Sequence, residues 1–143
     1  MLVRLLYASR AAQPLTHEAI DSILAQSRAH NPPLGITGIL CYGGNLFMQV
    51  LEGGREAVNK LYSDIVRDDR HQDVVLLHYE EISERRFAGW TMGQVNLGKI
   101  NPSIVLKYSE KPTLDPYAVP GRVSMALLEE LIATASIIGR TGP

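Results

Sequence analysis

The sequence predicts an α+β domain in which one β-sheet carries two helices on one face and a C-terminal helical tail on the other. Short strand-like runs alternate with segments of helical period over the first 97 residues, and an apolar helical segment follows them. The chain has 143 residues, of which 45% are hydrophobic and 20% charged, as in ordinary globular proteins. We expect a sheet domain over 1–97 and a helical extension over 98–143 that packs on the sheet.

The first two elements are a strand and an amphipathic helix. Residues 2–9 place apolar side chains on both faces at the period of two that a strand requires. Thr16 is a suitable N-cap, and isoleucine and leucine recur after it at helical spacing, which predicts a helix over 17–29. A pair of prolines then ends this helix, because proline lacks the N–H donor and restricts the residue before it.

The next elements are a hairpin, a second helix and two further strands. A Gly-Gly turn joins strand-like runs over 35–42 and 46–52, and residues 54–67 return to helical spacing. We expect a fourth strand to begin with 74–77 and a fifth to cover 90–95. The order β-α-β-β-α-β, extended by one strand, predicts a ferredoxin-like sheet with both helices on one face.

The tail is expected to cover the second face of the sheet. Leu6, Met48 and Val50 point to that face by strand alternation and are too apolar for a solvated surface. Ser124 is a candidate N-cap for a helix over 125–138 that is apolar nearly all round. Such a helix is usually buried or paired with a partner, so we expect it to pack on this face.

Composition excludes several classes of protein. Lys and Arg total 14 and Asp and Glu total 15, for a net charge of −1, so we expect no nucleic-acid partner. The single cysteine, Cys41, cannot form an intrachain disulfide, and the histidines lack metal-ligand spacing, so we expect no metal site. No apolar run approaches the roughly 20 residues that span a bilayer, and the N-terminus does not resemble a signal peptide. We therefore expect a cytoplasmic protein without a membrane partner.

Two polar residues are predicted to meet beneath the helices. Tyr7 and Gln49 point to the helix-covered face of the first and third strands, which are central neighbours in this sheet order. A buried Tyr-Gln pair is costly unless every polar atom finds a partner. The pattern alone favours a satisfied core pair, whereas the alternative is that a planar polar ligand supplies the missing partner. Asn31 follows the first helix and either ends it or offers its amide to such a ligand.

Other residues allow two interpretations each. Trp90 and Met92 lie two positions apart on the predicted fifth strand, so we expect their side chains on the same face. Both either fill the core or pack against an aromatic ligand. Arg70 and His71 either meet a phosphate-bearing ligand or lie in a solvated turn beside acidic residues.

Three further groups are expected to be chemically inert. Arg85 and Arg86 are expected to form a surface cluster with the glutamates at 80, 81 and 84. Glu52 has no carboxylate partner for acid–base catalysis, and Cys41 has no basic neighbour in sequence that would make it a nucleophile.

Taken together, these segments resemble the BLUF family, sensors of blue light using flavin adenine dinucleotide, from Leu2 to about Val95. The matching segments are Leu5-Leu6-Tyr7-Ala8-Ser9, His30-Asn31, Gly35-Ile36-Thr37-Gly38, Leu40-Cys41-Tyr42, Phe47-Met48-Gln49-Val50-Leu51-Glu52-Gly53, Asp69-Arg70-His71 and Arg86-Phe87-Ala88-Gly89-Trp90-Thr91-Met92. Each segment is weak alone, but their order and spacing are highly specific.

The resemblance implies a flavin whose ring lies between the two helices. FAD is the expected cofactor, and the residues alone do not distinguish it from FMN or riboflavin. The resemblance assigns the photochemistry to Tyr7 and Gln49 and places the relay of the signal at Trp90 and Met92. The residues that it places around the cofactor are Tyr7, Ser9, His30, Asn31, Gln49, Arg70 and His71.

The resemblance also implies a mechanism and a function. Neutral Tyr7 would give an electron and a proton to the excited flavin and regain them, leaving only the hydrogen bonds of the Gln49 amide changed. We expect a photoreceptor that is not an enzyme and that signals to a separate effector protein or through a homo-oligomer. The alternative hypothesis is a small ferredoxin-like hydrolase, similar to acylphosphatase. Such an enzyme needs an anion-binding loop with an arginine after the first strand, and Arg10 is a weak candidate for that arginine.

Overall fold

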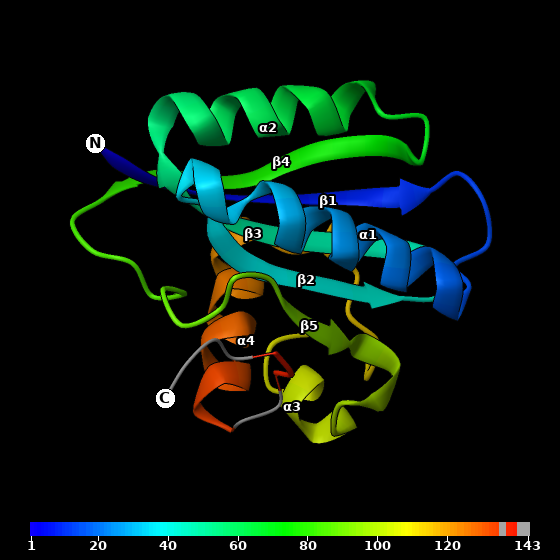
Figure 1. The fold of residues 1–143 in the computed structure, drawn as a ribbon. Helices are drawn as coiled ribbons and strands as arrows, with labels where there is room; N and C mark the ends of the chain where they lie inside the picture. The colour runs from blue at the N-terminus through cyan, green and yellow to red at the C-terminus, as the bar shows by residue number, and fades with distance from the viewer. Residues whose placement is uncertain (135–136, 140–143) are drawn as a thin grey trace.

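The computed structural model describes residues 1–134 and 137–139 and contains one five-stranded sheet in the order β4-β1-β3-β2-β5 (Figure 1). The elements are β1 (Leu2–Ala11), α1 (His17–His30), the 3₁₀ turn η1 (Pro32–Leu34), β2 (Thr37–Gly43), β3 (Leu46–Gly54), α2 (Arg55–Arg67), β4 (His71–Ile82), β5 (Gly93–Asn96), the 3₁₀ turn η2 (Leu97–Lys99), α3 (Pro102–Leu106) and α4 (Gly121–Ala133). The predicted ferredoxin-like arrangement is confirmed, with β5 added parallel to β2.

Strand pairing places β1 and β3 at the centre of the sheet. They pair antiparallel, and Tyr7 lies directly opposite Gln49. The hairpin between β2 and β3 turns at Gly44, which adopts a left-handed backbone conformation. The centre of the sheet therefore presents the two predicted site residues side by side.

Helix α1 begins and ends where its sequence predicts. The Thr16 hydroxyl accepts a hydrogen bond from the Ala19 N–H at 3.1 Å, which satisfies one of the free donors of the first turn. Ile20 and Leu24 form its buried stripe, one helical turn apart. The helix ends at His30 with Asn31 as its C-cap, because the following prolines form the separate turn η1.

The sheet separates two hydrophobic cores. On one face, α1 and α2 cover a core that includes Tyr7, Phe47 and Met92. On the other face, Leu6, Met48, Val50 and Trp90 pack in one cluster with the apolar side chains of the tail, which include Val105, Leu127, Leu128 and Leu131. The expectation that the tail covers the second face is confirmed. The division into 1–97 and 98–143 stays a prediction, since tail and sheet share this core.

The fifth strand is shorter than expected, and this changes the placement of Trp90 and Met92. Strand β5 begins at Gly93, whereas residues 90–92 form a bend before it. Trp90 packs into the tail-side core and Met92 into the helix-side core. The prediction of a shared face was wrong because strand parity holds only for extended backbone, and the chain crosses the sheet edge within this bend.

The tail helix also differs from its predicted bounds. It begins at Gly121, directly after Pro120, so Ser124 is buried inside the helix and does not cap it. It ends at Ala133, and Ile138 instead exchanges two backbone hydrogen bonds with Gln94 of β5. Residues 135–136 of the expected helix lie outside the described residues. A Cβ at position 121 would lie 1.9 Å from the Leu77 carbonyl oxygen, so only glycine allows this close approach to β4.

No helix in the described ranges has the length and apolar character needed to cross a bilayer.

Candidate functional site

A cavity of about 320 Å³ opens between α1 and α2 above the centre of the sheet. This volume lies at the small end of the range for ligand pockets, roughly 300–1,000 Å³. Its walls are Tyr7, Ile23, Gln26, Ser27, His30, Asn31, Leu34, Leu40, Gln49, Leu61, Asp64, Ile65, Asp68, Arg70 and His71. The cavity thus gathers all but one of the predicted cofactor-binding residues, and the exception, Ser9, contacts one of its walls.

Tyr7 and Gln49 form a buried hydrogen bond at the floor of the cavity. The Tyr7 hydroxyl donates to Gln49 Oε1 at 2.6 Å, and the two residues are 1% and 4% exposed. Burial raises the pKa of Tyr7 above its ordinary value, and the nearby Tyr62 and Asp68 raise it further, while Arg70 acts in the opposite direction. Tyr7 is therefore a neutral phenol, and the predicted contact is confirmed.

The other end of the Gln49 amide faces a methionine. Gln49 Nε2 lies 3.3 Å from Met92 Sδ, and a thioether sulfur is a weak acceptor. Because the phenol of Tyr7 fixes the carbonyl end, the NH₂ group points toward Met92 and keeps hydrogen-bonding capacity in reserve. Gln49 is held firmly at one end and weakly at the other, which suits an amide that must change partners.

Asn31 ends helix α1 with its backbone and leaves its side chain for the cavity. Its N–H donates to the Ser27 carbonyl at 2.9 Å, and its carbonyl accepts from the N–H groups of Leu34 and Ile36. Asn31 is 3% exposed, yet its side-chain amide has no hydrogen bond within the described part of the chain. The helix-ending interpretation accounts only for the backbone, and the side-chain amide that lines the cavity is available to hydrogen-bond a polar ligand.

The mouth of the cavity carries an arginine that is already neutralised. Arg70 Nη2 lies 2.6 Å from Asp68 Oδ2 and 3.1 Å from Gln26 Oε1. The hydrogen bond from Arg70 lowers the pKa of Asp68, although burial acts against it. Arg70 therefore borders the cavity as part of a neutral pair, which agrees with the acidic surroundings seen in the sequence.

His71 closes the far side of the cavity and links it to Ser9. His71 Nδ1 lies 2.7 Å from Ser9 Oγ, and its ring centre lies 4.9 Å from that of Phe47. Burial lowers the pKa of His71, Asp68 raises it and Arg70 lowers it again. This histidine is consequently an uncharged wall of the site above mildly acidic pH.

The remaining predicted residues divide between the site and the opposite core. His30 lies at the last position of α1 with an exposed side chain that lines the cavity. Met92 joins the site through Gln49, whereas Trp90 is buried on the other side of the sheet.

Sequence reasoning missed three contacts of the site. Leu61 and Ile65 share one stripe of the helix predicted over 54–67, and the sequence reasoning did not extend this to the apolar wall that they form in the cavity. Arg28 of α1 donates to the Met92 carbonyl at 3.0 Å, and no local pattern signals a contact over this separation. Tyr62 places its ring centre 5.8 Å from that of Tyr7.

Other candidate sites lose support. The described residues contain no cluster of side chains able to hold a metal ion. Cys41 is fully buried, and burial raises its pKa to about 12, which leaves an unreactive thiol. Arg10 lies 4.4 Å above the Tyr117 ring and pairs with Asp73, so it does not form the anion-binding loop that a hydrolase of the rival class needs.

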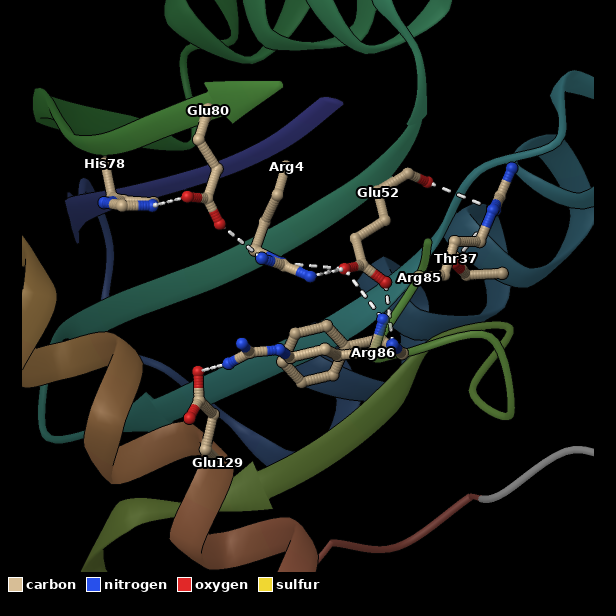
Figure 2. A network of polar contacts seen from close by, with 9 residues as sticks. Arg4, Thr37, Glu52, His78, Glu80, Arg85, Arg86 and Glu129 are labelled. Carbon is tan, nitrogen blue, oxygen red and sulfur yellow. Dashed lines mark hydrogen bonds and ion pairs between the residues drawn. The ribbon is translucent and has the colours of Figure 1, made fainter. Parts of the chain in front are cut away.

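The expected surface cluster of Arg85 and Arg86 with nearby glutamates is wrong. Arg85 donates to Thr37 Oγ1 at 3.0 Å, and Arg86 forms an ion pair with Glu129 of α4 (Figure 2). Local charge alternation did not predict these contacts because both arginines point across the loop toward segments distant in sequence.

The cavity fits a flat, partly polar ring. Ile23 of α1 and Leu61 and Ile65 of α2 supply apolar walls. The Asn31 amide and the Gln49 amide supply directed hydrogen-bonding groups at the cavity surface. These are the groups that a flavin ring requires, since its faces are apolar and its edge carries both donors and acceptors.

The comparisons with known proteins agree with this fit. The family model described as BLUF, "Sensors of blue-light using FAD", matches residues 2–93. Photoactivated adenylate cyclase subunit beta of Euglena longa is 40% identical over 92 residues, which are 64% of this chain and 11% of that relative. The blue light- and temperature-regulated antirepressor BluF of Escherichia coli K12 is 33% identical over 87 residues, 61% of this chain and 22% of that relative. This chain spans only a small part of these curated relatives.

Solved structures match more of the chain. The photo-activated state of BlsA has a TM-score of 0.80 at 30% identity and covers 100% of this chain and 99% of its own. The dark state of BlrB, a BLUF protein, has a TM-score of 0.78 at 34% identity and covers 94% of this chain and 96% of its own. The sensor class and FAD as the cofactor are confirmed by the family match. The chain belongs to the BLUF family of blue-light sensors that use FAD.

Proposed function

We propose that this chain detects blue light through Tyr7 and Gln49, with FAD held between α1 and α2, and passes the change to a separate effector protein or to a second copy of itself. The observation that carries the proposal is the 2.6 Å hydrogen bond from Tyr7 to Gln49 at the floor of a cavity that Asn31 also lines. Asn31, Gln49, His30, Arg70 and His71 hold the cofactor, and Ser9 supports it through His71.

The chemistry of the chain lies in the phenol and the amide. Bound FAD supplies the absorption of blue light and, once excited, an acceptor for one electron and one proton. Tyr7 gives up both and regains both, so its chemical form is restored. Gln49 changes its hydrogen bonds during this exchange, because an amide carries a donor and an acceptor on one end that can turn or tautomerise. With FAD bound, the altered hydrogen bonds of Gln49 would shift its absorption to the red.

The signal leaves the site through the bend at residues 90–92. Met92 contacts the amide of Gln49, and Trp90 lies in the core that α4 covers. A new setting of Gln49 therefore moves Met92 and, through the short connecting backbone, Trp90. The tail and strand β5 are the elements that this movement biases. This route is supported by contact alone, and the relay role of both residues is part of the proposal.

The output belongs to a partner. Similar chains are named for adenylate cyclase activity and for an antirepressor, which indicates that this sensor domain serves different effectors. We propose an effector protein or a homo-oligomer here, reached in the cytoplasm, without nucleic acid or membrane as the direct partner. The net charge of −1 and the buried, reduced Cys41 support this setting. We also propose residues 1–97 as the flavin-binding unit and residues 98–143 as its extension.

A difference spectrum tests the proposed photochemistry. Tyr7→Phe should keep FAD bound but lose the light-induced red shift, because the redox-active hydroxyl is gone and the rest of the cavity is unchanged. Tyr62→Phe is the matched control, since Tyr62 packs near Tyr7 without bonding to Gln49, and it should shift normally. Spectra of purified proteins in the dark and under blue light provide the measurement. A normal red shift in Tyr7→Phe, or a wild-type protein that cannot be loaded with flavin, would refute the proposal.

A further inference from the structure

A fully buried carboxylate connects the central strand β3 with the segment that carries Trp90 and Met92. Glu52 is 0% exposed and lies on the tail-side face of the sheet. Glu52 Oε2 accepts from Arg4 Nε at 2.7 Å and from the Arg86 N–H at 3.1 Å, and Glu52 Oε1 accepts from the Phe87 N–H at 2.7 Å (Figure 2). The Glu52 carboxylate therefore accepts hydrogen bonds from two backbone N–H groups of segment 86–92 and from the guanidinium of Arg4.

These two backbone contacts hold the start of segment 86–92, and further backbone hydrogen bonds follow along it. The Phe87 carbonyl accepts from the Trp90 N–H at 3.0 Å, and the Trp90 carbonyl accepts from the Gly38 N–H of β2 at 3.0 Å. Phe87 itself is fully buried in the tail-side core. A continuous series of hydrogen bonds thus runs from Glu52 through Phe87 to Trp90, and Met92 lies immediately beyond it.

A simple buried ion pair does not account for this arrangement. Arg4 alone would neutralise Glu52, and Arg4 also reaches Glu80, which is half exposed at the other end of the network. Glu52 nevertheless devotes Oε1 to a backbone N–H of the loop and shares Oε2 with a second one. Hydrogen bonds from backbone N–H groups to a buried carboxylate are stronger than those between neutral groups, and the one from Phe87 is short, so they hold the segment in place as well as satisfying the charge.

We infer that Glu52 is a positioning residue of the photosensory site, which sets the start of segment 86–92 and thereby the places of Trp90 and Met92. The inference rests on the proposed function, since it concerns the segment that relays the change at Gln49. Glu52 has no carboxylate partner for acid–base work, and its role is that of an acceptor for loop N–H groups. It acts from the face of the sheet opposite the cavity, so it influences the photocycle without touching FAD.

The test replaces the carboxylate with its isosteric amide. In Glu52→Gln, the NH₂ group cannot accept from the loop, so segment 86–92 loses part of its anchor and Met92 no longer restrains Gln49. Dark recovery of the red-shifted state should then accelerate on the order of tenfold, the change expected when a hydrogen bond to a charged group is lost. FAD occupancy after purification should equal that of the wild type, because the cavity walls are untouched.

Two controls separate positioning from general stability. Glu80→Gln removes the exposed end of the same network and leaves the loop contacts intact, so its recovery should match the wild type. Val105→Ala creates a cavity in the tail-side core and removes none of the hydrogen bonds of Glu52, so it should lower the melting temperature without changing recovery. Wild-type recovery in Glu52→Gln, or equal acceleration in Val105→Ala, would overturn the inference.

A measurement on the unmodified protein decides the case if Glu52→Gln does not fold. Hydrogen exchange of the Phe87 amide in the FAD-loaded wild type should be strongly protected in the dark and less protected under blue light. A Phe87 amide that exchanges as fast as exposed loop amides, or equally in both states, would contradict the inference. A wild type that loads FAD but shows no red shift would instead count against the proposed function, while dark protection of Phe87 would still report the anchor.

Discussion

Asn31 illustrates how one side chain separates a structural from a functional role. Its backbone completes the end of α1, whereas its amide faces the cavity without a partner in the described ranges. The two tasks use different atoms, so a substitution can remove one and keep the other. Sequence alone could not divide them, because an asparagine after a helix serves either purpose.

Replacing Asn31 by alanine should weaken FAD binding and leave the fold intact. Losing hydrogen bonds of about 1–2 kcal/mol raises the dissociation constant roughly tenfold. Fluorescence quenching during titration of the apoprotein with FAD measures the change. Glu18→Ala, on the exposed first turn of the same helix, is the control and should bind as the wild type does. Equal affinity in both variants would contradict the role of Asn31.

The burial of His71 predicts that the stability of the fold depends on pH. Burial places its pKa below the ordinary 6.5, so the folded protein binds this proton less tightly than the unfolded chain does. The contribution of neutral His71 to stability is then fully present above about pH 6.5 and is lost as pH falls below it toward the lowered pKa. Thermal unfolding between about pH 5 and pH 8 should show this decline in the wild type. His71→Asn should show a smaller decline, and identical profiles would argue against a buried neutral histidine.

At the scale of elements, regular segments followed their sequence pattern and irregular ones did not. Tyr7 and Gln49 could be paired in advance because strand alternation and sheet order together fix which side chains meet. Trp90 and Met92 could not, because a bend replaces the extended chain that alternation assumes. Ser124 was a plausible cap by residue type, but the start of α4 is set by contact between Gly121 and β4.

The start of α4 therefore offers a test of its docking on the sheet. In Gly121→Ala, the new methyl group would lie 1.9 Å from the Leu77 carbonyl oxygen, so the helix must shift. We expect a loss of about 1–3 kcal/mol in the free energy of unfolding, as for other overpacked positions. Gly54→Ala is the matched control, because nothing lies within 4 Å of its added Cβ. Urea unfolding monitored by circular dichroism measures both, and equal stability of the two variants would refute close docking.

For the whole molecule, the sequence predicted the sheet and the elements that cover its two faces better than the side-chain contacts between distant segments. Alternating apolar strands and an apolar tail were enough to expect a sheet covered on both faces, and both cores are present. The contacts of Arg28 with Met92 and of Arg86 with Glu129 join segments far apart in the chain, and no local pattern encodes such pairs. These long-range links join α1 to residue 92 and the segment before it to α4.

The bend at residues 90–92 gives the domain a mechanical property. The backbone ladder between neighbouring strands resists displacement in the plane of the sheet, so a small change at Gln49 is not readily passed through the strands themselves. Trp90 and Met92 sit two positions apart along the chain and are embedded in opposite interiors. In the proposed relay, a displacement of Met92 from one core would strain the short backbone segment and shift the Trp90 indole in the other core. The proposed movement would thus pass from one core to the other around the edge of the sheet, without passing through its strands.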